Sequence, residues 1–292
     1  MPVPEHLGSI VVMTTTEKAQ AGYVLGRTDE EYQRLRAQAR TWEAVTSRVL
    51  DAVGLSPGAS CLDAGCGPGE TMRLMAQRVG PAGRVVGVDV DASLGAQAET
   101  MLHGAGHEQC SFVAHDLTCG AEVPGAPFDV VYARLLLLHV ADPVDVLRHL
   151  WAAVAPGGHL LVHDYHLTST DVQPPLPAMQ EWDRVALGAF TLAGRDVRIG
   201  SRLPVLFEEA GVGAPDGTDV GGRLERLSGA APMIAAVYRS VLPAAVSFGL
   251  TSTEDGRRWL SDFDLEVREG GHRTGLWPLL IAAWKRKPGG PA

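Results

Sequence analysis

The sequence predicts an α/β protein with a doubly wound, Rossmann-like sheet. From residue 60 to residue 165, short apolar segments alternate with amphipathic ones, which is typical of βα units whose parallel strands are joined by right-handed crossovers. Runs such as VVGV (85–88) and LLV (160–162) are continuously apolar, as expected for strands that helices cover on both faces. The chain has 292 residues, of which 46% are hydrophobic. That is enough for a full core and argues against a disordered chain.

The expected elements follow in order along the chain. Residues 1–17 predict a loose arm with a short strand at 10–13, and residues 28–53 predict a helix. This helix can be capped by Thr28 or Asp29, and its apolar residues recur at a spacing of three and four. The alternating region predicts strands at 61–64, 84–90, 111–115, 128–132 and 159–164, with helices at 70–79, 93–102 and 143–154. The rest of the chain predicts a loop at 167–177, helices at 178–192, 203–210, 232–246 and 253–262, and strands at 218–228 and 276–284.

Composition and charge argue against several classes of function. The formal net charge is −9 and the longest basic stretch is 285–287, whereas nucleic-acid binding needs a clustered positive face. No run of 18 apolar residues occurs, so we expect no membrane contact. The MPVPEH start lacks the basic and apolar regions of a secretory signal. None of the four cysteines forms a CxxC pair, so we expect no disulfide framework or zinc site, and a cytoplasmic location.

The most informative segment is CLDAGCGPG, residues 61–69, between a predicted strand and a predicted helix. Gly65 and Gly67 let the backbone turn sharply and approach a ligand without a Cβ atom in the way. The helix that follows directs its amide groups toward the same edge of the sheet. Asp63 lies two residues before the first glycine. The order is G-x-G-x-G, with Glu70 where the dinucleotide fingerprint G-x-G-x-x-G has its last glycine.

Acidic residues close the next two predicted strands. Asp89, in GVDVD, can accept hydrogen bonds from both hydroxyls of a ribose. Asp116, in AHDL, can accept one from an adenine amino group, while Leu117 offers a backbone amide and an apolar edge. Taken alone, each aspartate is equally well explained as a helix cap or turn residue. Three acids at three strand ends favour a nucleoside site.

These motifs resemble those of the class I S-adenosylmethionine-dependent methyltransferases, in the small-molecule branch similar to the ubiquinone/menaquinone-type enzymes. The matching segments, in the order of the family's motifs, are DAGCGPG (63–69), GVDVD (87–91), AHD (114–116), FDVVYARLLLLHV (128–140) and APGGHLLVHD (155–164). The resemblance implies a seven-stranded sheet, mostly parallel with the last strand reversed. It also implies S-adenosyl-L-methionine as the cofactor and S-adenosyl-L-homocysteine as the product.

The resemblance assigns cofactor contacts to single residues. Asp63, Gly65 and Gly67 would line the methionine part of the cofactor, and Asp89 would hold the ribose. The adenine would lie beside Val90, Asp116 and Leu117. Arg134 would contact the methionyl end through its backbone. Residues 21–35 also resemble a lid motif of this branch. In it, Tyr23 would bond the methionyl carboxylate or lie near the methyl group, and Arg27 would neutralise that carboxylate. The alternative, that both are surface residues of an arm, stays open.

Candidate proton acceptors follow the fifth predicted strand, in HDYH (163–166). Asp164 and His166 lie at the sheet edge where a doubly wound fold binds ligands, and an imidazole titrates near neutral pH. Tyr23 completes the candidate catalytic residues. An equally good interpretation makes His166 a polar loop residue, and His139 occupies a family position that is more often structural than catalytic. Nothing indicates that the neighbouring histidines converge, so we expect no metal.

We therefore expect four segments along the chain. They are an N-terminal arm with a helical lid (1–55), a cofactor-binding Rossmann-like core (56–166), a mostly helical insertion that shapes a substrate pocket (167–260), and a final strand that completes the core sheet (261–292).

The expected function is methyl transfer to a small, largely apolar or aromatic metabolite in specialised natural-product biosynthesis. The acceptor atom is an oxygen, a nitrogen or an aromatic carbon such as that of an indole ring. Methylation of nucleic acid or protein is disfavoured by the acidic charge and by ARLL (133–136) where an Asn-Pro-type motif would stand. Two alternatives stay open: an NAD-dependent oxidoreductase, and a catalytically inactive partner protein that binds S-adenosylmethionine. A homo-oligomer is also left open, since an N-terminal arm can exchange between subunits.

Overall fold

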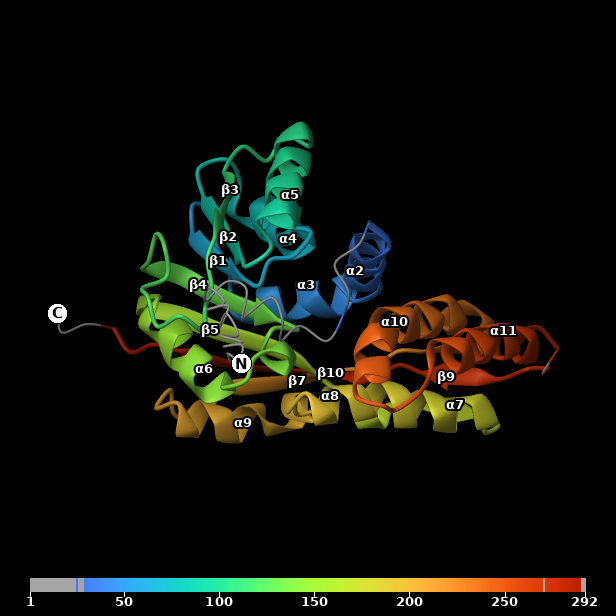
Figure 1. The fold of residues 1–292 in the computed structure, drawn as a ribbon. Coiled ribbons are helices and arrows are strands. Elements are labelled where there is room, and N and C mark those ends of the chain that lie inside the picture. The colour runs from blue at the N-terminus through green and yellow to red at the C-terminus, as the bar shows by residue number, and fades with distance from the viewer. Residues whose placement is uncertain (1–24, 26–28, 270, 290–292) are drawn as a thin grey trace, which may run out of the picture.

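The computed structural model describes Leu25, residues 29–269 and residues 271–289 (Figure 1). Its main sheet has seven strands in the order β3-β2-β1-β4-β5-β10-β7. Strands β1 to β5 pair in parallel, whereas β10 is antiparallel to both of its neighbours. The strands are β1 (Ser60–Ala64), β2 (Arg84–Asp89), β3 (Cys110–Ala114), β4 (Phe128–Arg134), β5 (Val154–His166), β7 (Gly217–Gly221) and β10 (Leu279–Arg286). The expected sheet with a reversed last strand is confirmed.

Helices cover both faces of this sheet, as the continuously apolar strands predict. One face packs against α3 (Glu43–Ala52), α4 (Glu70–Val79) and α5 (Ala92–Gly104). The other face packs against α6 (Pro143–Ala152) and α9 (Ile199–Glu209). The core therefore forms two apolar layers, one on each side of the sheet.

The helix expected at 28–53 is divided into α2 (Asp29–Thr41) and α3, because the backbone leaves helical geometry at Trp42. Trp42 is 1% exposed, and its ring lies 6.1 Å from the rings of both Tyr165 and Trp277. The apolar spacing continues across the break, so periodicity alone could not reveal it.

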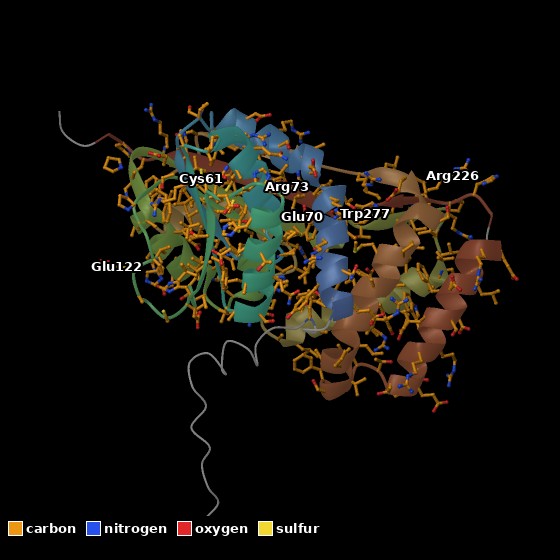
Figure 2. The ribbon with its side chains drawn as sticks, turned by 90° about the horizontal axis from the view of Figure 1, so that it is seen from above. Cys61, Glu70, Arg73, Glu122, Arg226 and Trp277 are labelled. Atoms are coloured by element: carbon orange, nitrogen blue, oxygen red, sulfur yellow. The ribbon has the colours of Figure 1, made fainter. Side chains whose placement is uncertain are left out.

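Beside the main sheet lies a mostly helical part with a small sheet of its own (Figure 1 and Figure 2). Its helical elements are α7 (Pro177–Trp182), the π-helical turn η3 (Asp183–Leu187), α8 (Gly188–Leu192), α10 (Leu227–Ser247) and α11 (Thr253–Glu269). Its antiparallel sheet has the order β6-β9-β8, with β6 (Asp171–Gln173), β9 (Thr274–Leu276) and β8 (Leu224–Arg226). Short 3-10 turns, η1 (Leu137–His139) and η2 (Leu167–Ser169), follow β4 and β5. Figure 2 shows Trp277 at the junction between α2 and this part.

Several expected elements differ in extent from the observed ones. The expected loop at 167–177 contains β6, and the strand expected at 218–228 is two strands, β7 and β8, which join different sheets. The strand expected at 276–284 is divided into β9 and β10 at Trp277 and Pro278. The segment 167–260 also contributes α9 and β7 to the core, and α11 continues past residue 260.

Among the described residues, α10 is the one helix that is long and apolar enough to cross a membrane by length and composition alone. It packs against α11 and α2. Its Met233, Ile234 and Val237 line the cavity described below. Part of its apolar surface is therefore used within this protein, where 28% of its most apolar window is buried.

Candidate functional site

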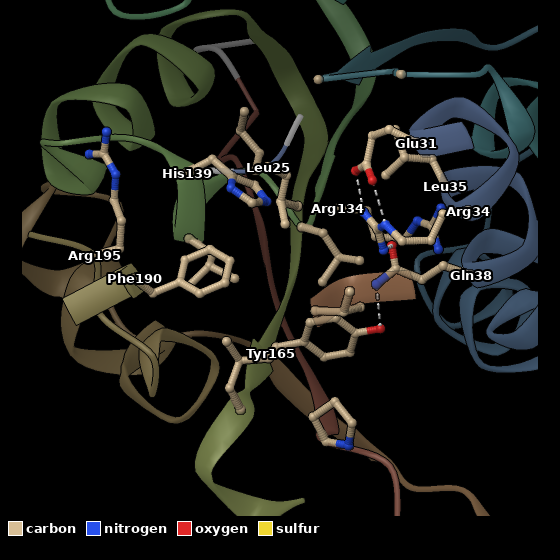
Figure 3. A pocket seen from close by; sticks show the side chains of 18 of the residues that line it. Leu25, Glu31, Arg34, Leu35, Gln38, Arg134, His139, Tyr165, Phe190 and Arg195 are labelled. Atoms are coloured by element: carbon tan, nitrogen blue, oxygen red, sulfur yellow. Dashed lines mark hydrogen bonds and ion pairs between the residues drawn. The ribbon is translucent and has the colours of Figure 1, made fainter. Parts of the chain in front are cut away.

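A cavity of about 620 Å³ lies at the edge of the main sheet where β1, β2 and β4 end. Residues of α2 form one wall (Figure 3). Residues of α7 to α8, α10 and β9 form another. Its lining includes all of the described residues that the resemblance assigns to the cofactor: Asp63, Gly65, Gly67, Asp89, Val90, Asp116, Leu117 and Arg134. Tyr23 and Arg27 lie outside the described residues.

The loop after β1 brings bare backbone to the cavity wall. Gly65 and Gly67 both have positive φ, +72° and +48°, a region that side chains rarely adopt. A Cβ on Gly65 would stand 3.0 Å from Leu136 Cδ1, whereas a Cβ on Gly67 would meet no atom within 4 Å. At position 65 glycine suits both the positive φ and the short distance to Leu136. At position 67 only the positive φ favours glycine, and the backbone there is open to a ligand.

The Asp89 carboxylate is held in place by backbone amides at the end of β2. Its Oδ2 accepts the N–H of Gly67 at 3.0 Å, and its Oδ1 accepts that of Asp91 at 2.9 Å. Asp91 in turn caps α5 by accepting from Leu94 N at 3.0 Å, and it accepts the Tyr32 hydroxyl at 2.8 Å. The glycine loop and the acid that follows β2 thus form one rigid unit on the cavity wall.

Buried polar atoms of several cavity-lining residues have no hydrogen-bond partner among the described residues. They include Asp63 Oδ2, His115 Nε2, Asp116 Oδ2 and Arg134 Nη1. Asp63 is only 2% exposed. Burial raises the pKa of its carboxyl to about 7, while the positive charge of Arg134 acts in the opposite direction. Because unpaired buried polar atoms are costly, these groups indicate a ligand that supplies both charges and hydrogen bonds, as an aminoacyl nucleoside does.

A buried polar network on α2 forms the opposite wall and was not evident from the sequence. Arg34 donates from Nε and Nη2 to the two carboxylate oxygens of Glu31, at 2.8 and 2.6 Å, and both side chains are about 95% or more buried. The Ser240 hydroxyl of α10 donates to the same carboxylate. Gln38, one helical turn further along, contacts Arg34 and Tyr165 (Figure 3). The signal in the sequence is three polar residues at i, i+3 and i+7 on one helix face.

The segment after β4 places His139 on the cavity. Leu135 has φ +55°, a strained conformation for a residue other than glycine, and its N–H donates to the His163 carbonyl at 2.8 Å. The His139 ring centroid lies 6.0 Å from that of Phe190. Burial lowers the pKa of His139 to about 3, and the charges of Arg34 and Arg195 act in the same direction. The imidazole is therefore neutral at physiological pH.

The far end of the cavity is apolar, and we call it the acceptor lobe. Its side chains come from η1, β6, the segment from α7 to α8, α10, β9 and the residue after β9. They are Leu138, Val172, Trp182, Ala186, Leu187, Phe190, Met233, Ile234, Val237, Leu276 and Trp277. The indole N–H of Trp182 is satisfied by the Ile234 carbonyl at 3.3 Å, so Trp182 adds no unpaired donor to the lobe.

Asp164 and His166, expected as proton acceptors, do not line the cavity. Asp164 is fully buried, and its carboxylate accepts the N–H groups of Leu138 and Tyr165 at 3.1 and 2.8 Å. Burial raises the pKa of Asp164 to about 7. The two ring nitrogens of His166 lie 3.0 Å from Ser201 Oγ and 2.8 Å from Thr168 Oγ1. The structure therefore gives neither residue access to a substrate in this cavity.

Strand alternation explains this correction. His163 and Tyr165 lie on one face of β5, whereas Asp164 and His166 lie on the face that α9 covers. The packing there is close, since a Cβ on Gly200 of α9 would stand 2.4 Å from the Asp164 carbonyl oxygen. The expected stretch was right, but the residue that reaches the cavity is Tyr165.

Comparisons with known proteins agree with the motifs. A family model described as a methyltransferase domain matches residues 31–212. The chain is 34% identical over 172 residues to nocamycin O-methyltransferase of Saccharothrix syringae. The aligned region covers 57% of this chain and 52% of that protein. The matches span from about two fifths to three fifths of the length of the first curated relatives.

Solved structures share the fold at low sequence identity. A crystal structure from Bacillus halodurans superposes with a TM-score of 0.57 at 18% identity, covering 83% of this chain and 98% of that one. The [4+2]-cyclase SpnF superposes with a TM-score of 0.50 at 20% identity, covering 85% and 82%. The fold is therefore shared with a protein named for a different reaction, and the chemistry has to be argued from the site.

Proposed function

Because the chain belongs to the methyltransferase-domain family, we propose that it transfers a methyl group from S-adenosyl-L-methionine to a small, largely apolar acceptor. The observation that carries the proposal is one cavity with two unlike ends. One end presents a glycine loop and buried polar atoms without partners among the described residues, and the other is lined mainly by the apolar side chains of the acceptor lobe.

The residues of the polar end fit this cofactor. Asp63 and Arg134 carry opposite charges, as the zwitterionic aminoacyl tail requires, and Asp89 is oriented to accept from ribose hydroxyls. Asp116, with Val90 and Leu117, would hold the adenine. We keep Tyr23 and Arg27 as proposed contacts of the methionyl end. When bound, the cofactor supplies a methyl group already activated on a sulfonium sulfur.

The protein's own part in the reaction is alignment and exclusion of water. Alignment of two bound reactants contributes about 7–11 kcal/mol to lowering a barrier, so a strong general base is needed only where the acceptor must lose a proton. His139 is a neutral imidazole on the cavity wall. A pKa of about 3 makes it a weak base, so in this proposal it orients the acceptor through a hydrogen bond, and a proton lost by the acceptor passes to water. The acceptor atom stays open among oxygen, nitrogen and aromatic carbon.

We also propose a role in natural-product biosynthesis and a cytoplasmic setting. The likeness to nocamycin O-methyltransferase supports the first. The second is supported by four free cysteines, of which Cys61, Cys66 and Cys110 are buried, since a reducing compartment keeps thiols in this state.

Calorimetry with the purified protein tests the cofactor assignment. S-adenosylhomocysteine should bind about ten-fold or more tightly than 5′-methylthioadenosine, which lacks the aminoacyl tail that Asp63 and Arg134 would hold. NADH is the control for the oxidoreductase alternative. Binding of NADH without binding of S-adenosylhomocysteine would overturn the proposal.

Turnover tests the reaction itself. Incubation with labelled S-adenosylmethionine and a panel of phenols, indoles and apolar acids should release S-adenosylhomocysteine and label at least one acceptor. Tight cofactor binding with no consumption in any mixture would favour the inactive-partner alternative, or a reaction of the kind named for the cyclase.

A further inference from the structure

Tyr165 stands between the two ends of the cavity and has no assigned role. It is the last residue but one of β5, is 5% exposed and lines the cavity. In Figure 3 its ring lies between Phe190 and the polar side chains of α2, and its hydroxyl points toward Gln38. The position is therefore suited to contact a molecule that extends from the acceptor lobe toward the polar end.

The neighbours of Tyr165 fix which way its hydrogen bonds run. Arg34 is held by Glu31, and its Nη1 lies 3.4 Å from Gln38 Oε1. A guanidinium group can only donate hydrogen bonds, so this contact assigns the amide oxygen of Gln38 to the Arg34 side. The amide nitrogen then faces Tyr165 and donates to its hydroxyl oxygen at 3.1 Å.

A second donor reaches the same oxygen. The Trp42 indole N–H donates to the Tyr165 hydroxyl at 2.6 Å, and an indole nitrogen has no lone pair to accept with. Within the described part of the chain, the Tyr165 hydroxyl makes two hydrogen bonds, one with Gln38 and one with Trp42. Its oxygen thus receives two hydrogen bonds, and its own proton is donated to neither neighbour.

We propose that the Tyr165 hydroxyl donates this proton in a hydrogen bond to the acceptor molecule, and that the acceptor joins an apolar body to a hydrogen-bond-accepting oxygen such as a carbonyl or a phenolate. The inference rests on the proposed function in one respect, which is that the cavity holds an acceptor beside the cofactor. A buried hydroxyl that is already accepting twice favours a partner oxygen and disfavours a partner N–H, which would leave two donors facing each other. Tyr165 is in this sense a specificity-determining and positioning residue.

Two probes of matched shape test the proposal without knowledge of the natural acceptor. They are 2-acetylnaphthalene, which carries a carbonyl oxygen, and 2-isopropylnaphthalene, which does not. Dissociation constants are measured by equilibrium dialysis against the full chain saturated with S-adenosylhomocysteine. In Tyr165→Phe, the affinity for the ketone should fall about 3- to 10-fold, which is the scale of one hydrogen bond, while that for the hydrocarbon stays within two-fold.

A second variant keeps the Tyr165 phenol but gives its hydroxyl proton a hydrogen-bond acceptor within the protein. In Gln38→Glu, a carboxylate replaces the amide donor and accepts from Tyr165, so the preference for the ketone should be lost although the ring remains in place. This variant also covers the case in which Tyr165→Phe folds poorly, since that change leaves Trp42 and Gln38 as unpaired buried donors. Tyr238→Phe is the matched control, because Tyr238 is a buried tyrosine of α10 that does not line the cavity. The ratio of its dissociation constants for the ketone and the hydrocarbon should equal that of the wild type.

Each other outcome overturns the proposal. An unchanged ratio in both variants shows that the hydroxyl does not meet the carbonyl oxygen, and failure of the wild type to bind either probe shows that the lobe does not take an apolar body of this kind. A more than ten-fold loss of S-adenosylhomocysteine affinity in Tyr165→Phe would assign the proton to the cofactor carboxylate instead. Failure of the proposed function is distinguished by calorimetry of the wild type, which would then detect no binding of S-adenosylhomocysteine at all.

Discussion

The two ends of the cavity are built in opposite ways. At the polar end, each functional side chain lies within a few residues of a strand end, and the backbone amides of Gly67 and Asp91 hold the Asp89 carboxylate in place. At the acceptor lobe, the walls come from segments as far apart in sequence as Val172 and Leu276, and apolar packing holds them together.

The two constructions differ in how well they tolerate substitution. Local hydrogen bonds at strand ends resist substitution, because each lost partner leaves a buried group unpaired. An apolar wall tolerates substitutions that conserve volume. We therefore expect variants at the polar end to alter cofactor affinity and variants at the acceptor lobe to alter acceptor affinity, and the following experiments test that separation.

The largest effect is expected for Asp89→Ala. Loss of a carboxylate that accepts charge-assisted hydrogen bonds should weaken S-adenosylhomocysteine binding by about 10- to 100-fold, and it also leaves the amides of Gly67 and Asp91 unpaired. Calorimetry measures the change, and thermal unfolding shows whether the loop stays folded. Affinity within two-fold of the wild type, in a folded variant, would place the ribose elsewhere.

The next effect is a dependence of cofactor affinity on pH. Burial raises the pKa of Asp63 to about 7, opposed by Arg134, and a bound ammonium group favours the ionised carboxylate. Below pH 7 the free protein carries a proton on Asp63 that must leave when the cofactor binds. The affinity for the cofactor is therefore fully present above pH 7 and is lost as the pH falls. We expect about ten-fold weaker binding of S-adenosylhomocysteine at pH 6 than at pH 8. Asp63→Asn should flatten the profile, and a flat wild-type profile would contradict the assignment.

A smaller effect on the other ligand is expected for Met233→Ala. This half-buried side chain of α10 lines the acceptor lobe, so its truncation should weaken 2-isopropylnaphthalene binding by about 3- to 10-fold through lost apolar contact. Cofactor affinity should stay within two-fold. Met101→Ala is the matched control, because Met101 lies on α5 outside this cavity. Equal losses for cofactor and probe would break the separation between the two ends.

The smallest effect is expected for His166→Ala. Both ring nitrogens of His166 contact hydroxyl groups outside the cavity, so the affinities for cofactor and probe should change by less than about two-fold. Once an acceptor is known, kcat should change as little. A large fall in kcat with intact binding would restore His166 as a proton acceptor.

The sequence indicated which residues gather at the polar end of the cavity, because their positions depend on local patterns. Asp63, Asp89 and Asp116 follow strands that are recognisable from apolar runs, and parallel strands bring their carboxyl ends to one edge. The acceptor lobe depends on how distant segments meet, which no local pattern encodes. The same reason hid the link from Gln38 to Tyr165, which are 127 residues apart.

The expected proton acceptors Asp164 and His166 lie outside the cavity for a narrower reason. The HDYH stretch was correctly placed at the end of a strand, but neighbouring strand residues face opposite sides of a sheet. Only the packing of α9 reveals that the side of Asp164 and His166 is closed. The break of the first helix at Trp42 was hidden in a similar way, because its cause is the burial of the indole against Tyr165 and Trp277.

The position of β10 bears on how the molecule assembles during synthesis. β10 is the last strand along the described chain, yet it lies between β5 and β7, and β7 pairs with no other strand of the main sheet. A nascent polypeptide can therefore pair β1 to β5, glycine loop included, long before β7 finds its neighbour. β9, which carries Leu276 of the acceptor lobe, precedes β10 by only two residues. One late segment leaving the ribosome thus completes both the sheet and the wall against which a substrate would rest.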